Sequence, residues 1–329
     1  MEFSMPSSEC LSKHACAAIL VVAAGATIAQ PYPSRPIRLV VPFAPGGSAD
    51  FVGRLVGQKL SETVGQQVVV ENRGGGSGMI GNDQVAKSIP DGYTLTIGTL
   101  GPFAVNQSLF GKMPYDPVRD FAPVTLTGAA SHVLVAHPSI PITTVKDLIA
   151  LAKAKPGQLT FASSGIGKAT HLTGELFKYL AKVELVHVPY KGGGPAMTDL
   201  MGGQVSFSFA SMPSALPHVR SGRLHAIAVS AGKRSPAIPE LPTVAESGLP
   251  GFASEDWQGI LAPAKTPPEI VAKLNGELQR VLGLPELKEK LIAAGFDART
   301  STPEWFADFM KAETVKWAKV VKEAGIKAE

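Results

Sequence analysis

Short runs of aliphatic and β-branched residues alternate with helical patterns along most of this chain, and this rhythm limits the fold more than any other feature. Residues 37–41 read IRLVV, which is typical of a strand buried on both faces. A segment rich in Pro and Gly ends this run, and residues 49–64 then repeat apolar side chains at helical spacing. The same order recurs at residues 68–70, at a helix that ends near 88, and at 93–97. It predicts a doubly wound α/β sheet with helices on both faces.

The alternation repeats in the rest of the chain. Strand-like runs are expected at residues 132–136, 159–162, 185–188, 205–209, 224–230 and 257–261. Helical patterns are expected at residues 143–154, 170–180, 196–201, 268–282, 285–294 and 303–324. Two α/β lobes account for these elements, and the composition becomes loop-like near residues 130 and 250. We therefore expect one lobe to combine residues 30–131 with 254–329, and the other lobe to span 132–253.

The first 29 residues read as an export signal rather than as part of a fold. Lys13 and His14 precede the uncharged run ACAAILVVAAGATIA, whose 15 residues match the apolar region of a signal peptide and are short for a membrane-spanning helix. Small residues near Ala26 and Ala29 supply cleavage sites. We expect residues 1–29 to be removed and the remaining chain to be periplasmic. A buried or membrane-anchoring helix is the alternative interpretation.

Charge and cysteine content exclude several classes of protein. The 31 Lys and Arg residues against 27 Asp and Glu give a net charge of +4 over 329 residues, without the dense basic stripe that a nucleic-acid partner requires. Cys10 and Cys16 both lie in the expected signal peptide, so the body of the chain has neither a disulfide scaffold nor a cysteine zinc site. No HExxH or GxSxG motif occurs, and GxGxxG is missing after the first strand. We expect no metal, no cofactor and no enzyme activity.

The loop between the first strand and the first helix carries the strongest ligand signal. It consists of Phe43, Ala44, Pro45, Gly46, Gly47, Ser48, Ala49 and Asp50. In open α/β sheets ligands bind at the carboxyl ends of strands, and paired glycines let backbone N–H groups approach a ligand closely. The N-terminus of the following helix favours an anion. This loop is therefore a candidate carboxylate site. The alternative is an ordinary turn in which Ser48 or Asp50 caps the helix.

A second loop, residues 163–171, has the same position between strand and helix in the second lobe. It superficially resembles a nucleotide-binding P-loop, but Ala162 replaces the first glycine of that motif and Ala169 replaces the serine or threonine after the lysine. Nucleotide binding is therefore excluded. His171 and Glu175 share one helix face, but two ligands do not make a metal site, so we expect a hydrogen-bonding or structural histidine.

A third loop, residues 188–196, contains Tyr190 followed by Lys191 and three glycines. Tyr190 either faces a ligand or packs the loop, and the sequence leaves both interpretations open. Lys191 is expected to be exposed to solvent. Its only expected role there is to attract an anion by its charge.

Seven segments together resemble one family. They are IRLVVPFAPGGSAD (37–50), ENRGGGSGMIG (71–81), PDGYTL (90–95), FASSGIGKATHL (161–172), VPYKGGGPAMTDLMGGQV (188–205), LPTVAESGLPGF (241–252) and WQGILAPAKTP (257–267). In this order they resemble the Bug-type receptors, which are the extracytoplasmic solute-binding proteins of tripartite tricarboxylate transporters. Each segment is moderately specific alone, but together they cover nearly all of the chain beyond residue 30.

The resemblance implies a type II periplasmic-binding-protein fold. In this fold two α/β lobes, each a doubly wound sheet with flanking helices, enclose a ligand cleft and close on it like a flytrap. Family members bind small organic anions, which include di- and tricarboxylates, acidic amino acids and aromatic acids. They typically hold a carboxylate with loop amides and ordered waters.

The resemblance also implies which positions bind the ligand. The matching positions are residues 43–50 of the first loop and Ser164, Gly165, Thr170 and His171 of the second. Phe209, Ala210 and Ser211 follow a second-lobe strand and are expected at the cleft edge. Asp256 is expected near the crossover between the lobes, with an exposed loop acid as the alternative. Lys168 stands where small residues are expected, so it either binds a second carboxylate or points to solvent.

The implied protein is a receptor rather than an enzyme. It is expected to capture a small organic carboxylate as a monomer and to deliver it to the membrane subunits of a tripartite transporter. Two alternatives stay open. One is a receptor that presents its solute to a membrane sensor, and the other is a secreted hydrolase that uses a serine in the cleft.

Overall fold

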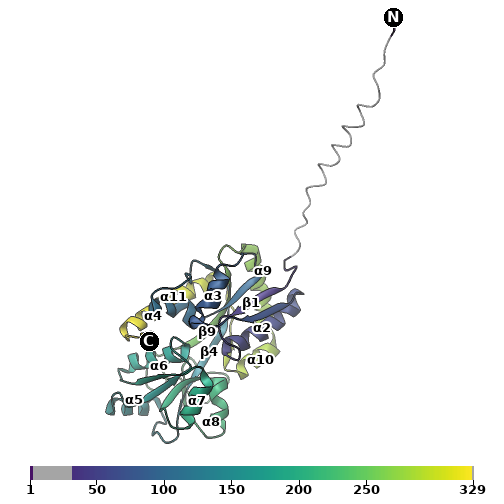
Figure 1. Ribbon diagram of the computed structural model, residues 1–329. Coiled ribbons are helices and arrows are strands. Elements are labelled where there is room, and N and C mark those ends of the chain that lie inside the picture. Colours follow the sequence, from purple (N-terminus) through teal and green to yellow (C-terminus); the bar gives the residue numbers. More distant parts are fainter. Residues whose placement is uncertain (3–31, 328–329) are drawn as a thin grey trace. The chain divides into compact units, whose positions relative to one another are not determined.

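The computed structural model describes residues 1–2 and 32–327, and its chain separates into two compact units, residues 1–34 and 35–329 (Figure 1). The predicted signal peptide, with Cys10 and Cys16, lies outside the described residues apart from Met1 and Glu2. The helices and strands of the described chain all lie in the second unit.

The strands of this unit pair in the order β2-β1-β3-β9-β4-β7-β5-β6, and β8 and β10 also pair with β4. The strands are β1 (Ile37–Val41), β2 (Val68–Asn72), β3 (Thr94–Thr99), β4 (Phe121–Ala136), β5 (Thr160–Ser163), β6 (Val186–Pro189), β7 (Phe207–Ser211), β8 (His225–Val229), β9 (Glu255–Pro263) and β10 (Phe296–Ala298). β1 is parallel to both β2 and β3, and β5 is parallel to both β6 and β7. β4 and β9 run antiparallel to their neighbours and lie side by side at the centre of Figure 1. The predicted α/β class with parallel strands is therefore confirmed.

Helices connect these strands, as the alternating pattern predicts. They are α2 (Ser48–Val64), the short helix η2 (Gly76–Gly78), α3 (Met79–Ala86), η3 (Gly101–Val105), α4 (Asn106–Phe110), α5 (Val145–Ala154), α6 (Ala169–Ala181), α7 (Gly193–Met201), α8 (Met212–Arg220), α9 (Pro268–Gly283), α10 (Pro285–Ala293) and α11 (Pro303–Glu323). α5 begins at Thr144, whose side chain accepts a hydrogen bond from the Asp147 amide in a capping box. α2 ends at Gly65, which adopts a φ of 69° that favours glycine. Within residues 32–327 no helix is both long and apolar enough to cross a bilayer.

β4 changes partners along its length. Its first part, through Ser131, pairs with β9, whereas residues from His132 onward pair with β7. The chain near residue 130 is not the loop that its composition suggests, because Ala130 lies inside one continuous strand of 16 residues. The division into lobes at this point stays a prediction. Small residues at this point lower the strand propensity, but backbone pairing with β9 compensates for it.

Several elements have no counterpart in the predicted pattern. α8 contains Pro217 and carries a proline in its first turn, so its sequence reads as a loop. β10 spans only three residues, too few for a periodic signal. η3 and α4 follow β3 directly and together form a compact apolar segment.

Aromatic side chains fill the core on both sides of β4. Phe177, Phe209 and Phe252 pack against one another, with ring centroids 5.7 to 6.2 Å apart. Trp257 meets the ring of Phe306 on α11 edge to face at 5.8 Å. All five rings are almost fully buried, and they form part of the hydrophobic core beside β7 and β9.

Candidate functional site

The first loop presents backbone donors at the N-terminus of α2. Gly47 is the N-cap residue, and no side chain caps this helix end. The first helical hydrogen bond runs from the Phe51 amide to the Gly47 carbonyl, so the amides of residues 48–50 have no acceptor within the helix. Ala44 through Gly47 are exposed. An anion can therefore reach these donors.

Asp50 shapes this loop from behind. Its buried carboxylate accepts hydrogen bonds from the Gly46 amide at 2.9 Å, from Arg54 Nε at 3.1 Å and from Asn72 Nδ2 at 2.9 Å. Burial alone raises the pKa of Asp50, but the bonds from Arg54, Gly46 and Asn72 outweigh it and hold the pKa below its usual range. The carboxylate is thus occupied by the protein.

The segment after β2 supports the same loop. Asn72 Nδ2 also donates to the Phe43 carbonyl at 3.1 Å. A Cβ at Gly74 would lie 3.2 Å from the Ala44 nitrogen, so a larger residue there would push the loop outward. The loop geometry is therefore fixed by β2 as well as by α2.

The second loop is tied to the start of α6 by its own side chains. The Ser164 amide donates to Thr170 Oγ1 at 3.0 Å, and the hydroxyls of the two residues lie 2.9 Å apart. The Gly167 amide donates to His171 Nδ1 at 3.2 Å. Ser164 and Gly165 stay partly exposed, whereas Thr170 and His171 are buried. Thr170 and His171 therefore position the loop, and Ser164 and Gly165 form its accessible edge.

His171 is buried and packs against His187, which is partly exposed. Its ring stacks on His187 with centroids 4.1 Å apart, and His187 Nε2 lies 2.7 Å from Ser163 Oγ. Burial lowers the pKa of His171 to about 3 and that of His187 to about 4, so both rings are neutral at physiological pH. Ser163 and His187 resemble a nucleophile and its base, but Ser163 is fully buried and no substrate can reach it. Among the described residues no group of three or more His, Cys, Asp or Glu side chains is arranged to hold a metal.

Lys168 stands at the N-cap of α6. Its side chain is exposed, and within residues 32–327 its ammonium forms neither a hydrogen bond nor an ion pair. Enough protein surrounds it that burial still lowers its pKa. A cation at a helix N-terminus opposes the helix dipole, so this placement is unfavourable without an anionic partner.

The second loop approaches η3 and α4 closely. A Cβ at Gly101 would lie 3.0 Å from the Gly167 carbonyl oxygen, so these backbones meet where only glycine fits. Asn106 is fully buried beside them, and its Nδ2 donates to the Ser77 carbonyl at 3.1 Å. Its Oδ1 is buried without a hydrogen-bond partner among the described residues.

β9 presents alternate side chains to opposite sides. Glu255 and Trp257 face Arg299 and Phe306 on one side. Gln258 faces the other side, where its Nε2 donates to Ser48 Oγ at 2.7 Å. Gln258 thereby connects β9 to the first residue of α2.

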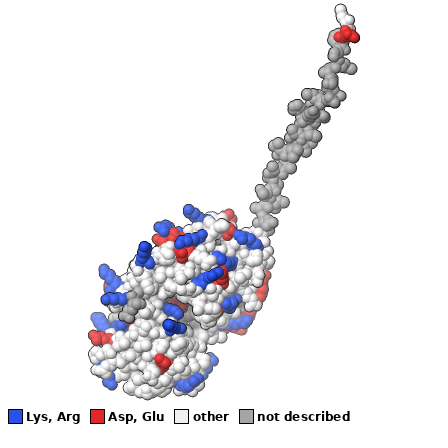
Figure 2. Space-filling view, viewed as in Figure 1, with Lys and Arg blue, Asp and Glu red and all other residues white. Residues whose placement is uncertain are grey.

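Asp256 lies on the same strand face as Gln258. Its side chain is partly exposed, and protein surrounds it closely enough that burial raises its pKa to about 7. Within the described range 32–327 its carboxyl forms no hydrogen bond or ion pair. Asp256 is thus partly exposed and yet desolvated by the protein around it. Figure 2 shows one face of the molecule hollowed between its two halves.

The other predicted positions are occupied within the protein. The ring of Phe209 packs on Phe252 in the core, and Ala210 is buried. Ser211 Oγ lies 2.7 Å from Ser214 Oγ. The structure therefore brings the side chain of Phe209 to the core and not to the cleft edge.

Tyr190 is held by its own segment. Its hydroxyl donates to Asp199 Oδ2 at 2.7 Å, and burial together with this acidic partner raises its pKa to about 12. This contact favours the packing interpretation, in which Tyr190 fixes the third loop against α7.

Gln258 and Asn106 are polar residues of this region that the sequence interpretation missed. Strand geometry places Asp256 and Gln258 on one face, but residues 255–258 read EDWQ and show no alternation of polar and apolar side chains that would have marked that face. Nothing in the sequence distinguishes Asn106 from an ordinary surface residue, because its burial depends on the close approach of Gly101 and Gly167.

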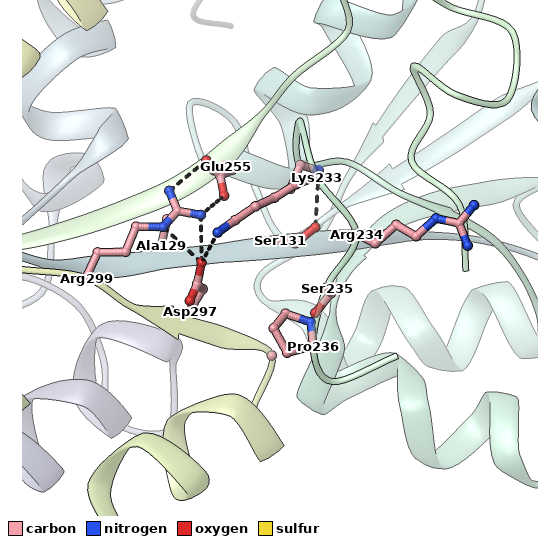
Figure 3. A pocket seen from close by; sticks show the side chains of 11 residues that line it. Ala129, Ser131, Lys233, Arg234, Ser235, Pro236, Glu255, Asp297 and Arg299 are labelled. Carbon is pink, nitrogen blue, oxygen red and sulfur yellow. Dashed lines mark hydrogen bonds and ion pairs between the residues drawn. The ribbon is translucent and has the colours of Figure 1, made fainter. Parts of the chain in front are cut away.

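An ion-pair cluster occupies the opposite side of β9 (Figure 3). Arg299 Nη2 contacts Glu255 at 2.8 Å and Asp297 at 2.9 Å, and Lys233 Nζ contacts the same Asp297 oxygen at 3.0 Å. The cavity beside these residues has a volume of about 10 Å³, which holds a single water and no solute. The cluster links the segment after β8 to β9 and the end of β10.

Comparison with known proteins agrees with this arrangement. The family model described as "Tripartite tricarboxylate transporter family receptor" matches residues 52–326. The protein BugT of Bordetella pertussis is 40% identical over 300 residues, which cover 91% of this chain and 92% of BugT.

Two solved structures carry ligands in their descriptions. An R. palustris protein with adipate is 40% identical, with a TM-score of 0.83 and coverage of 90% of this chain and 99% of that one. MatC from Rhodopseudomonas palustris with bound malate is 34% identical, with a TM-score of 0.78 and coverage of 88% and 100%. The two-lobed binding-protein fold is thus confirmed, and the chain belongs to the Bug-type receptors of the tripartite tricarboxylate transporter family, which are substrate-binding proteins and not enzymes.

Proposed function

We propose that this protein is a periplasmic receptor that binds a small organic carboxylate between its two lobes and delivers it to the membrane subunits of a tripartite transporter. The observation that carries the proposal is the uncapped, exposed N-terminus of α2, held in place by Gln258 and Asp50. The adipate and malate bound by related proteins support a carboxylate ligand.

The chemistry of the first loop fits this ligand. The free amides of residues 48–50 donate to one carboxylate, and the helix dipole adds about 0.3–1 kcal/mol at an exposed site. Ser164, Gly165 and Lys168 form the opposing edge and close on the distal end of the ligand. The residues proposed to contact it are Phe43, Ala44, Pro45, Gly46, Gly47, Ser48, Ser164, Gly165 and Asp256. Asp50, Thr170, His171, Tyr190, Phe209, Ala210 and Ser211 are proposed to support these contacts from behind.

The proposed lobes are residues 30–131 with 254–329 and residues 132–253. The change of partners along β4 at Ser131 and His132 supports this division, because the strand leaves one set of pairings and enters another there. Hinge closure across β4 and β9 then sequesters the ligand. We further propose that residues 1–29 are the export signal and that the receptor acts as a monomer.

Calorimetry of the protein without residues 1–29 against a panel of carboxylates tests the proposal. A comparison of Ser48→Pro with Ser48→Ala isolates the backbone donor, because both variants lose the hydroxyl and only proline loses the N–H. Gly47 has φ −85° and ψ 173°, which a following proline tolerates, and proline is favoured at the first position of a helix.

We expect Ser48→Pro to bind carboxylates at least about tenfold more weakly than Ser48→Ala at equal thermal stability. Equal affinity of the two variants would show that the Ser48 N–H at the start of α2 does not bind the ligand. A protein that binds a sugar or a neutral base but no carboxylate would overturn the proposed function itself.

A further inference from the structure

Asp256 occupies a defined place between two helices of opposite lobes. Two positions before it, Ser254 Oγ lies 2.7 Å from Thr173 Oγ1 on α6. Two positions after it, Gln258 donates to Ser48 at the start of α2. Gln258 shares a face of β9 with Asp256, and Ser254 lies just before the strand. Asp256 therefore stands between the residue that contacts α6 and the residue that contacts the α2 N-terminus.

The strand surroundings leave room above the Asp256 carboxyl. β3 ends with Thr99 opposite Gln258, so β9 has a strand neighbour only on the β4 side at Asp256. There its register partner is Ala130, whose methyl group fills little space and offers no hydrogen bond. The carboxyl is therefore partly exposed and unpaired from within the sheet.

The neighbouring acid, Glu255, is paired within the protein. Glu255 accepts two hydrogen bonds from Arg299, at 2.8 and 3.2 Å. Asp256, one residue on, has no such partner within the described residues, although burial disfavours its charge strongly. Burial disfavours an unpaired carboxylate, so a positively charged group from outside the chain would stabilise the ionised form of Asp256.

We propose that Asp256 is a specificity-determining residue that selects carboxylates bearing an ammonium group. The inference rests on the proposed function, because the ligand carboxylate is taken to bind the amides of α2. The ammonium of such a ligand then donates to Asp256 on the adjacent strand face. Gln258 Oε1, which is fully buried without a partner in the described structure, adds a second acceptor on that face. The Asp256 carboxylate and Gln258 Oε1 both accept hydrogen bonds, so they bind a ligand group that donates them. A carboxylate without further substituents has no such donor.

Matched ligand series test this selection. Succinate, malate and aspartate share four carbons and differ by hydrogen, hydroxyl and ammonium, and adipate with 2-aminoadipate forms a longer pair. Affinities are measured by calorimetry for the wild-type protein and for Asp256→Asn, which keeps the shape and removes the charge. Asp308→Asn is the control, because Asp308 is 78% exposed on α11.

We expect the wild-type protein to bind the aminated member of at least one series about tenfold or more tightly than the unsubstituted member, and Asp256→Asn to bring this ratio close to one. Asp308→Asn leaves the ratio unchanged. If Asp256→Asn weakens both members equally, or if the wild-type protein prefers the plain or the hydroxylated ligand, the role of Asp256 is overturned while the carboxylate receptor stands. A protein that binds no member of either series overturns both proposals.

Discussion

Gln258 Nε2 donates a hydrogen bond of 2.7 Å to Ser48 Oγ, joining two residues 210 positions apart in the chain. The bond ties β9 to the first turn of α2, whose free amides form the proposed carboxylate site. A movement of β9 in the proposed hinge closure would therefore be transmitted to the α2 N-terminus.

Replacing Gln258 by alanine is expected to weaken carboxylate binding about tenfold and to lower stability by about 1 kcal/mol, because a buried hydrogen bond is lost and Ser48 is left without its donor. Calorimetry and urea unfolding measure the two effects. Gln279→Ala is the control, since the exposed Gln279 donates a similar bond to Asn275 one turn earlier on α9. Unchanged affinity in Gln258→Ala would show that β9 does not set the position of the α2 N-terminus.

Local signals in the sequence predicted local features of this fold well. The helix predicted over residues 143–154 matches α5, because its start and its apolar spacing are set within a few turns of chain. The first loop was readable because glycine, proline and a helix start follow a buried strand. These features depend on residues that are close in the sequence, so they can be predicted without knowledge of the tertiary structure.

Features that depend on distant partners were not readable. The ring of Phe209 enters the core because β7 pairs with β4 in a register that places Phe209 opposite Leu134. Gln258 gained its role from Ser48, and β10 exists only because β4 provides an edge for it. The sequence pattern shows which residues share a face of a strand, but it does not show which distant residues pack against that face.

The exposed ammonium of Lys168 is expected to bind a second carboxylate. Lys168→Ala should weaken dicarboxylates several-fold more than monocarboxylates of equal length, because the contact is a single charge in a partly exposed site. Titrations at low and high salt measure this difference, which should shrink as salt screens the charge. Lys153→Ala on α5 serves as the control. Equal losses for both ligand classes would place the Lys168 side chain in solvent.

The ion-pair cluster behind β9 should contribute unequally to stability. Lys233 is 67% exposed, so Lys233→Ala is expected to change the free energy of unfolding by less than about 1 kcal/mol. Arg299→Ala should cost clearly more, because it leaves the half-buried carboxylates of Glu255 and Asp297 without their shared partner. Chemical denaturation of the two variants decides between them. A larger effect from Lys233 would reverse this assignment.

The stacked histidines predict how stability changes with pH. The pKa of His171 in the folded protein, about 3, lies below its ordinary value of 6.5, because burial disfavours the charged ring. The unfolded chain therefore binds protons before the folded one does, and stability is lost as the pH falls from about 7 toward about 4. His187, with a folded pKa of about 4, acts in the same direction.

The variant His171→Asn keeps an acceptor for the Gly167 amide and removes the titrating ring. Thermal unfolding at pH values from about 7 to about 4 should therefore show a shallower loss of stability than in the wild-type protein. His225→Asn, at the exposed start of β8, should leave the wild-type slope intact. An unchanged slope in His171→Asn would assign the acid sensitivity to other groups, such as the carboxylates that pair in the folded state.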